Sequence, residues 1–190
     1  KLLNAAATKA KMVQAIRQLF DSAAPGSTCV ITYSGHGTWA PDDSGDESDG
    51  RDEALCPHDI DTVGPLLDDE IRVLFAQRPA GVKLVLISDS CHSGSVTRGN
   101  DSEVDPGMPR ARFLPPEVWP KGKMLPKTAA PLSATTNGLA SAGTDLLLAG
   151  CIDKQYSWDS SFGGRPNGAF TYYALKTLGS LKSGVSYEAW

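Results

Sequence analysis

The run Lys83-Leu84-Val85-Leu86-Ile87-Ser88-Asp89-Ser90-Cys91 is the strongest structural signal in the chain, because an apolar segment ends abruptly in small polar residues and a cysteine. It predicts a buried strand over Val82–Ser88. The run Cys29-Val30-Ile31-Thr32-Tyr33-Ser34-Gly35-His36-Gly37 has the same pattern, and it predicts a buried strand over Thr28–Tyr33. Since ligands bind beyond the carboxyl ends of strands in open α/β sheets, we expect His36 and Cys91 to meet at one sheet edge.

Further helices and strands surround these two runs. Apolar residues at helical spacing predict helices over Thr8–Phe20, Leu66–Phe75 and Ala169–Leu178. The apolar run Leu146–Cys151 predicts a third strand, and the Gly-, Asp- and Ser-rich stretch Gly35–Arg51 is expected to be a loop. Strands that alternate with helices indicate an α/β sandwich around a mainly parallel sheet. Because this fold usually has more strands, we expect another strand and helix upstream.

Composition narrows the class of protein. The 190 residues suit one domain, and the net charge of -4 argues against a nucleic-acid partner. No apolar run is long enough to span a bilayer, so we expect no membrane segment. The four cysteines lack metal-binding spacing, and most lie in apolar surroundings. This favours reduced thiols and a cytoplasmic location.

The segment 98–137 differs from the rest of the chain. It is rich in proline, has little periodicity and carries six basic residues, namely Arg98, Arg110, Arg112, Lys121, Lys123 and Lys127. Long stretches without regular structure inside a compact domain are usually functional or disordered. We interpret it as a flexible linker between a larger part, residues 1–97, and a smaller part, residues 138–190, of one domain.

Cys91 and His36 are residue types that act together in nucleophilic catalysis. A cysteine attacks as the thiolate, and it needs a lowered pKa or an adjacent base. Gly37 permits close approach of backbone, and its N–H together with that of Cys91 is suited to hold an oxyanion. Either residue alone is more often a core cysteine or a satisfied polar histidine, but the two runs together favour a catalytic pair.

The motifs resemble those of a known family. Tyr33-Ser34-Gly35-His36-Gly37 and Asp89-Ser90-Cys91-His92-Ser93-Gly94 resemble the two signature motifs of metacaspases and orthocaspases. The resemblance implies a caspase-like three-layer α/β/α sandwich, with a large-subunit (p20-like) part before the linker and a small-subunit (p10-like) part after it. It also implies a monomeric cysteine endopeptidase that cleaves protein or peptide substrates after Arg or Lys, with Cys91 as nucleophile and His36 as its partner.

An acidic pocket is the simplest way to select a cationic side chain. Asp89 and Ser34 each lie two residues before a catalytic candidate, so they point to the same side of an extended chain. In the family these two positions contribute to the pocket for the basic residue. The alternative for Asp89 is a carboxylate that caps a nearby turn.

The run Tyr156-Ser157-Trp158-Asp159 provides a second indication of this specificity. It resembles a caspase run in which an arginine receives the substrate aspartate, and Asp159 reverses that charge. Tyr156 and Trp158 either form the wall of the neighbouring subsite or are simply packing residues.

Calcium is implied by the resemblance, since many metacaspases need it. Asp52, Asp68 and Asp69 match family calcium ligands in type and spacing, and calcium prefers clustered carboxylate oxygens. A fourth family aspartate falls near Arg98 here, which departs from the pattern. The alternative is an acidic loop and a helix start with N-terminal acidic charges.

Two hypotheses remain beside the endopeptidase. One is a catalytically silent caspase-like scaffold or adaptor, and the other is a cysteine hydrolase of the same fold class that acts on a different substrate. If the chain does cleave after Arg or Lys, the cations of its linker predict that it cuts itself between about Arg98 and Lys127.

Overall fold

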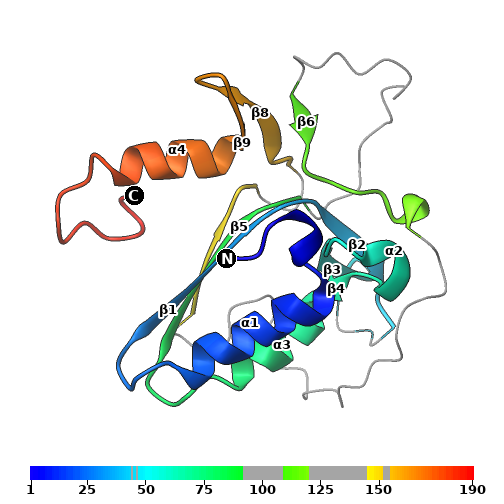
Figure 1. Ribbon diagram of the computed structural model, residues 1–190, viewed down its shortest axis with the longest axis horizontal. Helices are drawn as coiled ribbons and strands as arrows, with labels where there is room; N and C mark the ends of the chain where they lie inside the picture. Colours follow the sequence, from blue (N-terminus) through cyan, green and yellow to red (C-terminus); the bar gives the residue numbers. More distant parts are fainter. Residues whose placement is uncertain (44, 46, 92–108, 120–144, 152–154) are drawn as a thin grey trace.

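The computed structural model describes residues 1–43, 45, 47–91, 109–119, 145–151 and 155–190. Its central sheet is parallel and has the order β1 (Thr28–Ser34), β5 (Lys83–Asp89), β7 (Asp145–Ala149). The helices α1 (Lys9–Asp21) and α3 (Asp68–Ala76) lie on one side of this sheet, and α4 (Ala169–Leu178) lies on the other (Figure 1). The predicted α/β sandwich with a mainly parallel sheet is therefore confirmed.

The main core lies between the sheet and the pair α1 and α3. Thr8 caps α1 by accepting a hydrogen bond from the N–H of Lys11 at 3.4 Å, as N-cap threonines do. The apolar stripe of α1, which ends in the buried Phe20, packs with a cluster from α3 and the central sheet that includes Ile71 and Leu84. The predicted helices over Thr8–Phe20 and Ala169–Leu178 are confirmed, and α3 begins two residues later than predicted.

Burial differs among the three strands of the central sheet. Strand β5 is paired on both edges and mostly buried, as predicted. Strands β1 and β7 were expected to be buried too, and that prediction is wrong: Val30 is 49% exposed and Leu147 is 37% exposed. Among the described strands of this sheet, only β5 has a neighbour on each side. Phe170 of α4 lies close to Gly150, just after β7, whereas Val30 on β1 is half exposed.

A small antiparallel sheet follows β1. It has the order β2 (Gly37–Pro41), β3 (Arg51–Leu55), β4 (Leu66–Leu67). The loop predicted over Gly35–Arg51 is therefore wrong at its start, because residues after His36 form a strand instead. Ala40, Ala54 and Leu67 of this sheet form a second buried cluster. Two short helices complete this half: η1 (Asn4–Ala6) and α2 (Ile60–Val63).

A third sheet includes part of the predicted linker. Its order is β6 (Arg110–Ala111), β8 (Trp158–Phe162), β9 (Arg165–Gly168), and the helical turn η2 (Pro116–Val118) follows β6. The prediction of an unstructured linker is thus wrong for residues 109–119. The rest of the linker, which includes Arg98, lies outside the described residues. In the part of the chain that is described, no helix combines the length and apolarity that a membrane span requires.

Candidate active site

Parallel pairing brings His36 and Cys91 to the same edge of the central sheet. In the register of β1 and β5, Ser34 lies opposite Asp89, which are the last residues of the two strands. His36 and Cys91 each follow two residues later, and the N–H of Gly35 donates to the Asp89 carbonyl at 3.4 Å. The predicted pair therefore occupies equivalent positions on neighbouring strands, beyond their carboxyl ends.

The backbone around His36 is held by two hydrogen bonds. Its carbonyl accepts from the Tyr33 hydroxyl at 2.6 Å and from the Cys56 N–H at 3.1 Å. The Tyr33 ring folds back so closely that a Cβ on Gly35 would lie 2.7 Å from its hydroxyl oxygen. A glycine is therefore needed before His36, a requirement that sequence reasoning did not state for Gly35.

His36 is exposed to solvent, although the surrounding protein still affects its titration. Burial lowers the pKa of His36, with Asp159 opposing this shift and the Arg112 cation adding to it. A hydrogen bond with the Arg112 backbone also favours the protonated ring. The neutral imidazole, which is able to accept a proton, is thereby favoured.

The Cys91 side chain is fully buried and lies against the backbone of Ser157. The Ser157 N–H donates to Cys91 Sγ at 2.7 Å, and the thiol donates to the Ser157 carbonyl at 3.2 Å. The pKa of Cys91 is lowered, chiefly by a hydrogen bond from Cys151, and further by backbone hydrogen bonds from Ser157 and Arg112. Burial opposes this shift. Such surroundings favour the thiolate, which is the nucleophilic form.

Two N–H groups expected to hold an oxyanion share one acceptor. The Gly37 N–H donates to the carbonyl oxygen of Arg112 at 2.9 Å, and the Cys91 N–H donates to the same oxygen at 3.1 Å. Arg112 comes from the linker, directly after β6. A peptide carbonyl from this chain therefore lies where these donors would hold the carbonyl of a bond under attack.

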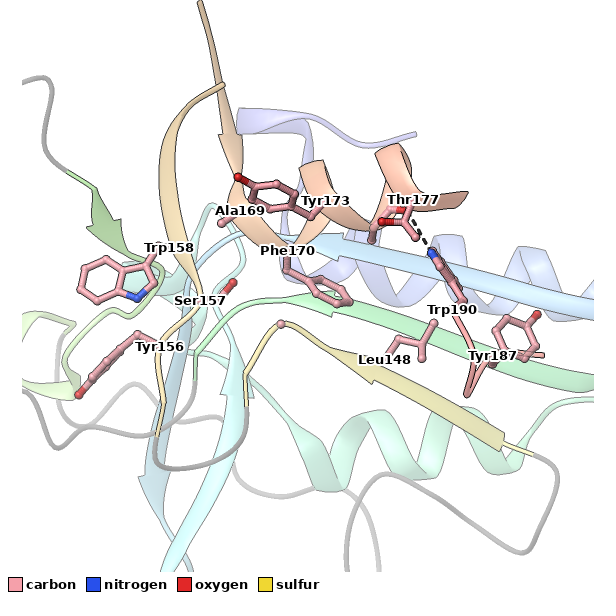
Figure 2. A pocket seen from close by; sticks show the side chains of 12 residues that line it. Leu148, Tyr156, Ser157, Trp158, Ala169, Phe170, Tyr173, Thr177, Tyr187 and Trp190 are labelled. Atoms are coloured by element: carbon pink, nitrogen blue, oxygen red, sulfur yellow. Dashed lines mark hydrogen bonds between the residues drawn. The ribbon is translucent and has the colours of Figure 1, made fainter. Parts of the chain in front are cut away.

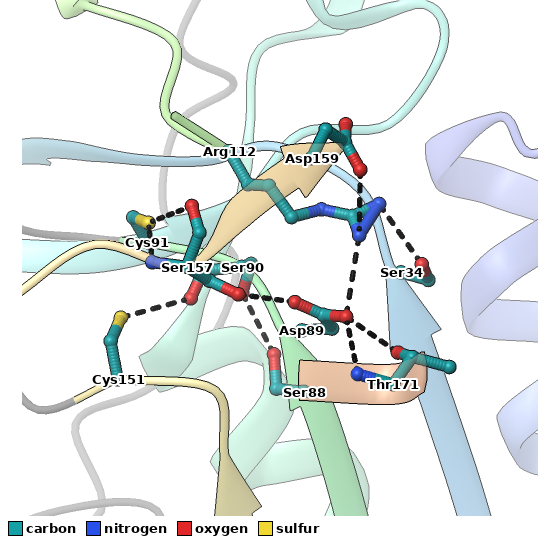
Figure 3. A network of polar contacts seen from close by, with 10 residues as sticks. All are labelled: Ser34, Ser88, Asp89, Ser90, Cys91, Arg112, Cys151, Ser157, Asp159 and Thr171. Carbon is teal, nitrogen blue, oxygen red and sulfur yellow. Dashed lines mark hydrogen bonds and ion pairs between the residues drawn. The ribbon is translucent and has the colours of Figure 1, made fainter. Parts of the chain in front are cut away.

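The side chain of Arg112 enters an acidic pocket, which Figure 3 shows from close by. Its Nη1 lies 3.4 Å from Asp89 Oδ2 and 3.3 Å from Asp159 Oδ1. Its Nη2 donates to the Ser34 hydroxyl at 3.0 Å. The guanidinium side chain is 8% exposed. The structure thus brings Ser34, Asp89 and Asp159 together around one arginine.

Asp89 forms the buried base of this pocket. It is inaccessible to solvent and accepts hydrogen bonds from the Ser157 hydroxyl, from the Thr171 N–H at 2.9 Å and from the Thr171 hydroxyl at 2.5 Å. Thr171 lies in the first turn of α4, so Asp89 also caps that helix. The pocket and capping interpretations of Asp89 are therefore compatible, because the same carboxylate makes both sets of contacts.

Three residues of the pocket escaped sequence reasoning. Ser157 and Thr171 hold Asp89, and Gly168 leaves the space for the arginine: a Cβ there would collide with Arg112 Nη1 and Asp89 Oδ2. Small residues leave no pattern that distinguishes such a role. For Ser157, the one available signal was its position inside the motif Tyr156-Ser157-Trp158-Asp159.

The two aromatic residues of that motif lie next to each other at the start of β8. Trp158 is 43% exposed and is paired in register with Ala111, the residue before Arg112. Tyr156 makes an edge-on contact with Trp158, with ring centroids 5.8 Å apart. Both line a cavity of about 370 Å³ between β7, α4 and the C-terminal residues Tyr187 and Trp190 (Figure 2). The two rings therefore pack against each other, and their role in a subsite stays a prediction.

Two of the three aspartates matched to calcium ligands form ion pairs with one arginine. Arg72 Nη2 lies 3.0 Å from Asp68 Oδ2, and its Nη1 lies 3.1 Å from Asp69 Oδ1. Burial raises the pKa of Asp68 to about 6, against the opposing effect of the Arg72 cation. The charges of Asp69 and of the buried Asp52 add smaller contributions to this rise. Among the described residues, no group of three or more His, Cys, Asp and Glu side chains is arranged to hold a metal ion. Asp68 Oδ1 is buried and has no hydrogen-bond partner among the described residues, and calcium binding stays a prediction.

The sheet order and the cysteine and histidine beyond neighbouring strands define the class of caspase-like proteins. The chain belongs to the metacaspase family: the family model for the metacaspase, peptidase C14 domain matches residues 1–98. The chain is 34% identical to Metacaspase-1 of Arabidopsis thaliana, over 95% of this chain and 46% of that protein. It is 30% identical to Metacaspase-1 of Mycosarcoma maydis, over 90% of this chain and 48% of that protein.

A solved structure has a similar fold. The crystal structure of protein GSU0716 from Geobacter sulfurreducens matches with a TM-score of 0.68 and 32% sequence identity, covering 99% of this chain and 68% of that one. With respect to the two Metacaspase-1 proteins, the chain spans nearly half of their length. The caspase-like fold expected from the motifs is confirmed by the sheet and by this neighbour together.

Proposed function

We propose that this chain is a cysteine endopeptidase that cleaves peptide bonds after Arg or Lys, with Cys91 and His36 as its catalytic residues. One observation carries the proposal: an arginine lies with its carbonyl oxygen between the N–H groups of Gly37 and Cys91, while its side chain contacts the carboxylates of Asp89 and Asp159. This is the arrangement that a substrate arginine needs on the amino side of a scissile bond.

The proposed reaction begins with the Cys91 thiolate. Its sulfur attacks the carbonyl carbon of the substrate arginine, and the resulting oxyanion is held by the N–H groups of Gly37 and Cys91. His36 holds the proton taken from the thiol when the thiolate forms, and it delivers this proton to the leaving amine as the C–N bond breaks. Water then hydrolyses the thioester, which releases the new carboxylate and restores the Cys91 thiol.

Charge determines the proposed specificity. Two carboxylates within 3.4 Å of a guanidinium favour a cation, and one of them is fully buried. A substrate aspartate in the same place would bring a third negative charge into a pocket with little solvent. Like charges at this separation cost several kcal/mol in an interface, so cleavage after Asp is expected to be negligible.

Further properties belong to the same proposal. We expect a monomeric cytoplasmic enzyme that acts on proteins or peptides and processes itself within the linker. Calcium activation is a separate expectation that concerns Asp52, Asp68 and Asp69, two of which form ion pairs with Arg72.

The test uses matched fluorogenic peptides that differ only in a terminal Arg, Lys or Asp. They are assayed on the wild-type chain and on Cys91→Ala, each with calcium and with a chelator. We expect Arg and Lys peptides to be cleaved at least about 100-fold faster than the Asp peptide, which corresponds to roughly 3 kcal/mol of discrimination. Cys91→Ala should be inactive on all three.

Each other outcome has a defined meaning. Preferential cleavage after Asp would contradict the pocket assignment, and equal activity of Cys91→Ala would contradict the nucleophile. Inactivity of the folded protein on every peptide under both conditions would favour the scaffold hypothesis. Equal rates with calcium and with the chelator would contradict the calcium expectation alone.

A further inference from the structure

The linker residues around Arg112 occupy the candidate active site as a bound peptide would. Before Arg112, β6 pairs antiparallel with β8, with Arg110 opposite Asp159 and Ala111 opposite Trp158. The Arg112 N–H then donates to the Ser157 carbonyl at 2.9 Å. Adding a strand to an exposed sheet edge is a common way for proteins to bind extended peptides.

The residues after Arg112 are held by contacts with β2. Phe113 forms a parallel bridge with Gly37, and the Leu114 N–H donates to the Gly37 carbonyl at 2.8 Å. Further on, the buried Trp119 indole donates to the Thr38 hydroxyl at 3.2 Å. The peptide group that joins Arg112 to Phe113 is therefore fixed from both directions beside the His36-Gly37 segment.

We propose that the bond between Arg112 and Phe113 is the processing site of this chain, and that each molecule cuts its own copy of that bond. The inference rests on the proposed function and narrows it from a segment of the linker to one bond. The carbonyl of Arg112 already accepts hydrogen bonds from both oxyanion donors, and its side chain already fills the acidic pocket.

Arg110 provides a contrast on the same strand. It is exposed and lies two residues before Arg112, where its register partner is Asp159 in the strand ladder. Its carbonyl is not among the acceptors of Gly37 and Cys91 in the described structure, since both bond Arg112. Of the two basic linker residues that are described, only Arg112 combines an occupied pocket with an occupied pair of donors.

The proposed step is a hydrolysis that needs only water. Cys91 Sγ leaves its contact with Ser157 and bonds to the carbonyl carbon of Arg112, while its proton passes through His36 to the nitrogen of Phe113. The C–N bond breaks, Phe113 becomes a new amino terminus, and water converts the thioester to the Arg112 carboxylate. The products are residues 1–112 and 113–190.

The two products are expected to stay together after the cut. Residues 113–190 contribute β7 to the central sheet beside β5, and their residue Trp119 packs with the buried cluster of Ala40, Ala54 and Leu67. Separation would expose these surfaces to water, which is unfavourable. The fragments should therefore co-elute in gel filtration and separate only under denaturing conditions.

The experiment measures intact mass and amino-terminal sequence of the purified chain over time. Wild type should yield a fragment that begins with Phe113, at a first-order rate independent of protein concentration. Cys91→Ala should remain intact. Arg112→Gln should lose this cut by at least about 100-fold, while the matched variant Arg110→Gln should keep it.

The peptide assay separates failure of this inference from failure of the proposed function. Cleavage of an added Arg peptide without a cut after Arg112 would overturn the inference and leave the endopeptidase standing. Cutting of Arg112→Gln at the Phe113 bond, or a rate proportional to protein concentration, would also overturn it. If neither the chain nor the Arg peptide is cut, the proposed function itself fails.

Discussion

Asp89 contacts both helix α4 and the arginine that fills the acidic pocket. It ends the central strand β5, caps the first turn of α4 through Thr171, and contacts the Arg112 guanidinium. Because it is fully buried, its charge depends on these partners for compensation. A single carboxylate thereby couples the position of α4 to the presence of a cation in the pocket.

Replacement of Cys151 is expected to change the pH dependence of activity. Its hydrogen bond is the main reason that the pKa of Cys91 is lowered, so its removal should raise that pKa and reduce the thiolate at a given pH. In Cys151→Ala, the acid limb of kcat/KM for an Arg peptide should move to higher pH, measured between about pH 5 and pH 9.

A second cysteine variant provides the control for this experiment. Cys29 is buried in the main core and belongs to the start of β1. Cys29→Ala should leave the acid limb in place, even if it lowers stability. An unchanged profile in Cys151→Ala would contradict the role assigned to Cys151.

At the junction of β9 and α4, the pocket has room for an arginine because Gly168 has no side chain. Gly168 ends β9 with φ of -66° and ψ of 135°, which any residue can adopt. Its importance is therefore steric: a Cβ there would collide with the arginine and with Asp89. Sequence reasoning predicted α4 to begin after this glycine, but it had no means of seeing what faces it.

Gly168→Ala should narrow the pocket without altering the catalytic pair. We expect kcat/KM for Arg peptides to fall by about 10- to 100-fold, since overpacking costs roughly 1–3 kcal/mol. Gly179→Ala is the matched control, because a Cβ there meets its nearest neighbour at an ordinary 3.6 Å. Unreduced cleavage by a folded Gly168→Ala variant would show that Arg does not bind against Gly168.

Prediction of the elements succeeded where local pattern and burial agree. The helix stripe of α1 and the apolar run of β5 are such cases, because one pattern determines one packed face. It failed at β2, whose residues Gly37–Pro41 have no apolar alternation and depend on pairing with β3. It failed again at β6, which depends on the edge of β8. Both strands are specified by distant partners rather than by their own residues.

For the molecule as a whole, the motifs predicted the fold and the edge at which the site lies. The register of β1 and β5 puts His36 and Cys91 at equivalent positions on the same sheet edge, as the two similar runs suggested. What could not be predicted is the arrival of Arg112, 21 residues after Cys91, in a pocket formed by Ser34, Asp89 and Asp159. That arrangement depends on the central sheet meeting the sheet of β6, β8 and β9, which no local pattern encodes.

The central claim is that Arg112 occupies the position of a substrate arginine, and it is tested most directly by a crystal structure of the processed chain with a peptidyl-arginine aldehyde. The aldehyde carbon should be bonded to Cys91 Sγ, with its oxygen near the N–H groups of Gly37 and Cys91. The guanidinium should lie between Asp89 and Asp159, with Arg112 displaced. An inhibitor bonded to Cys91 whose arginine lies outside this pocket, with Arg112 still inside, would contradict the account.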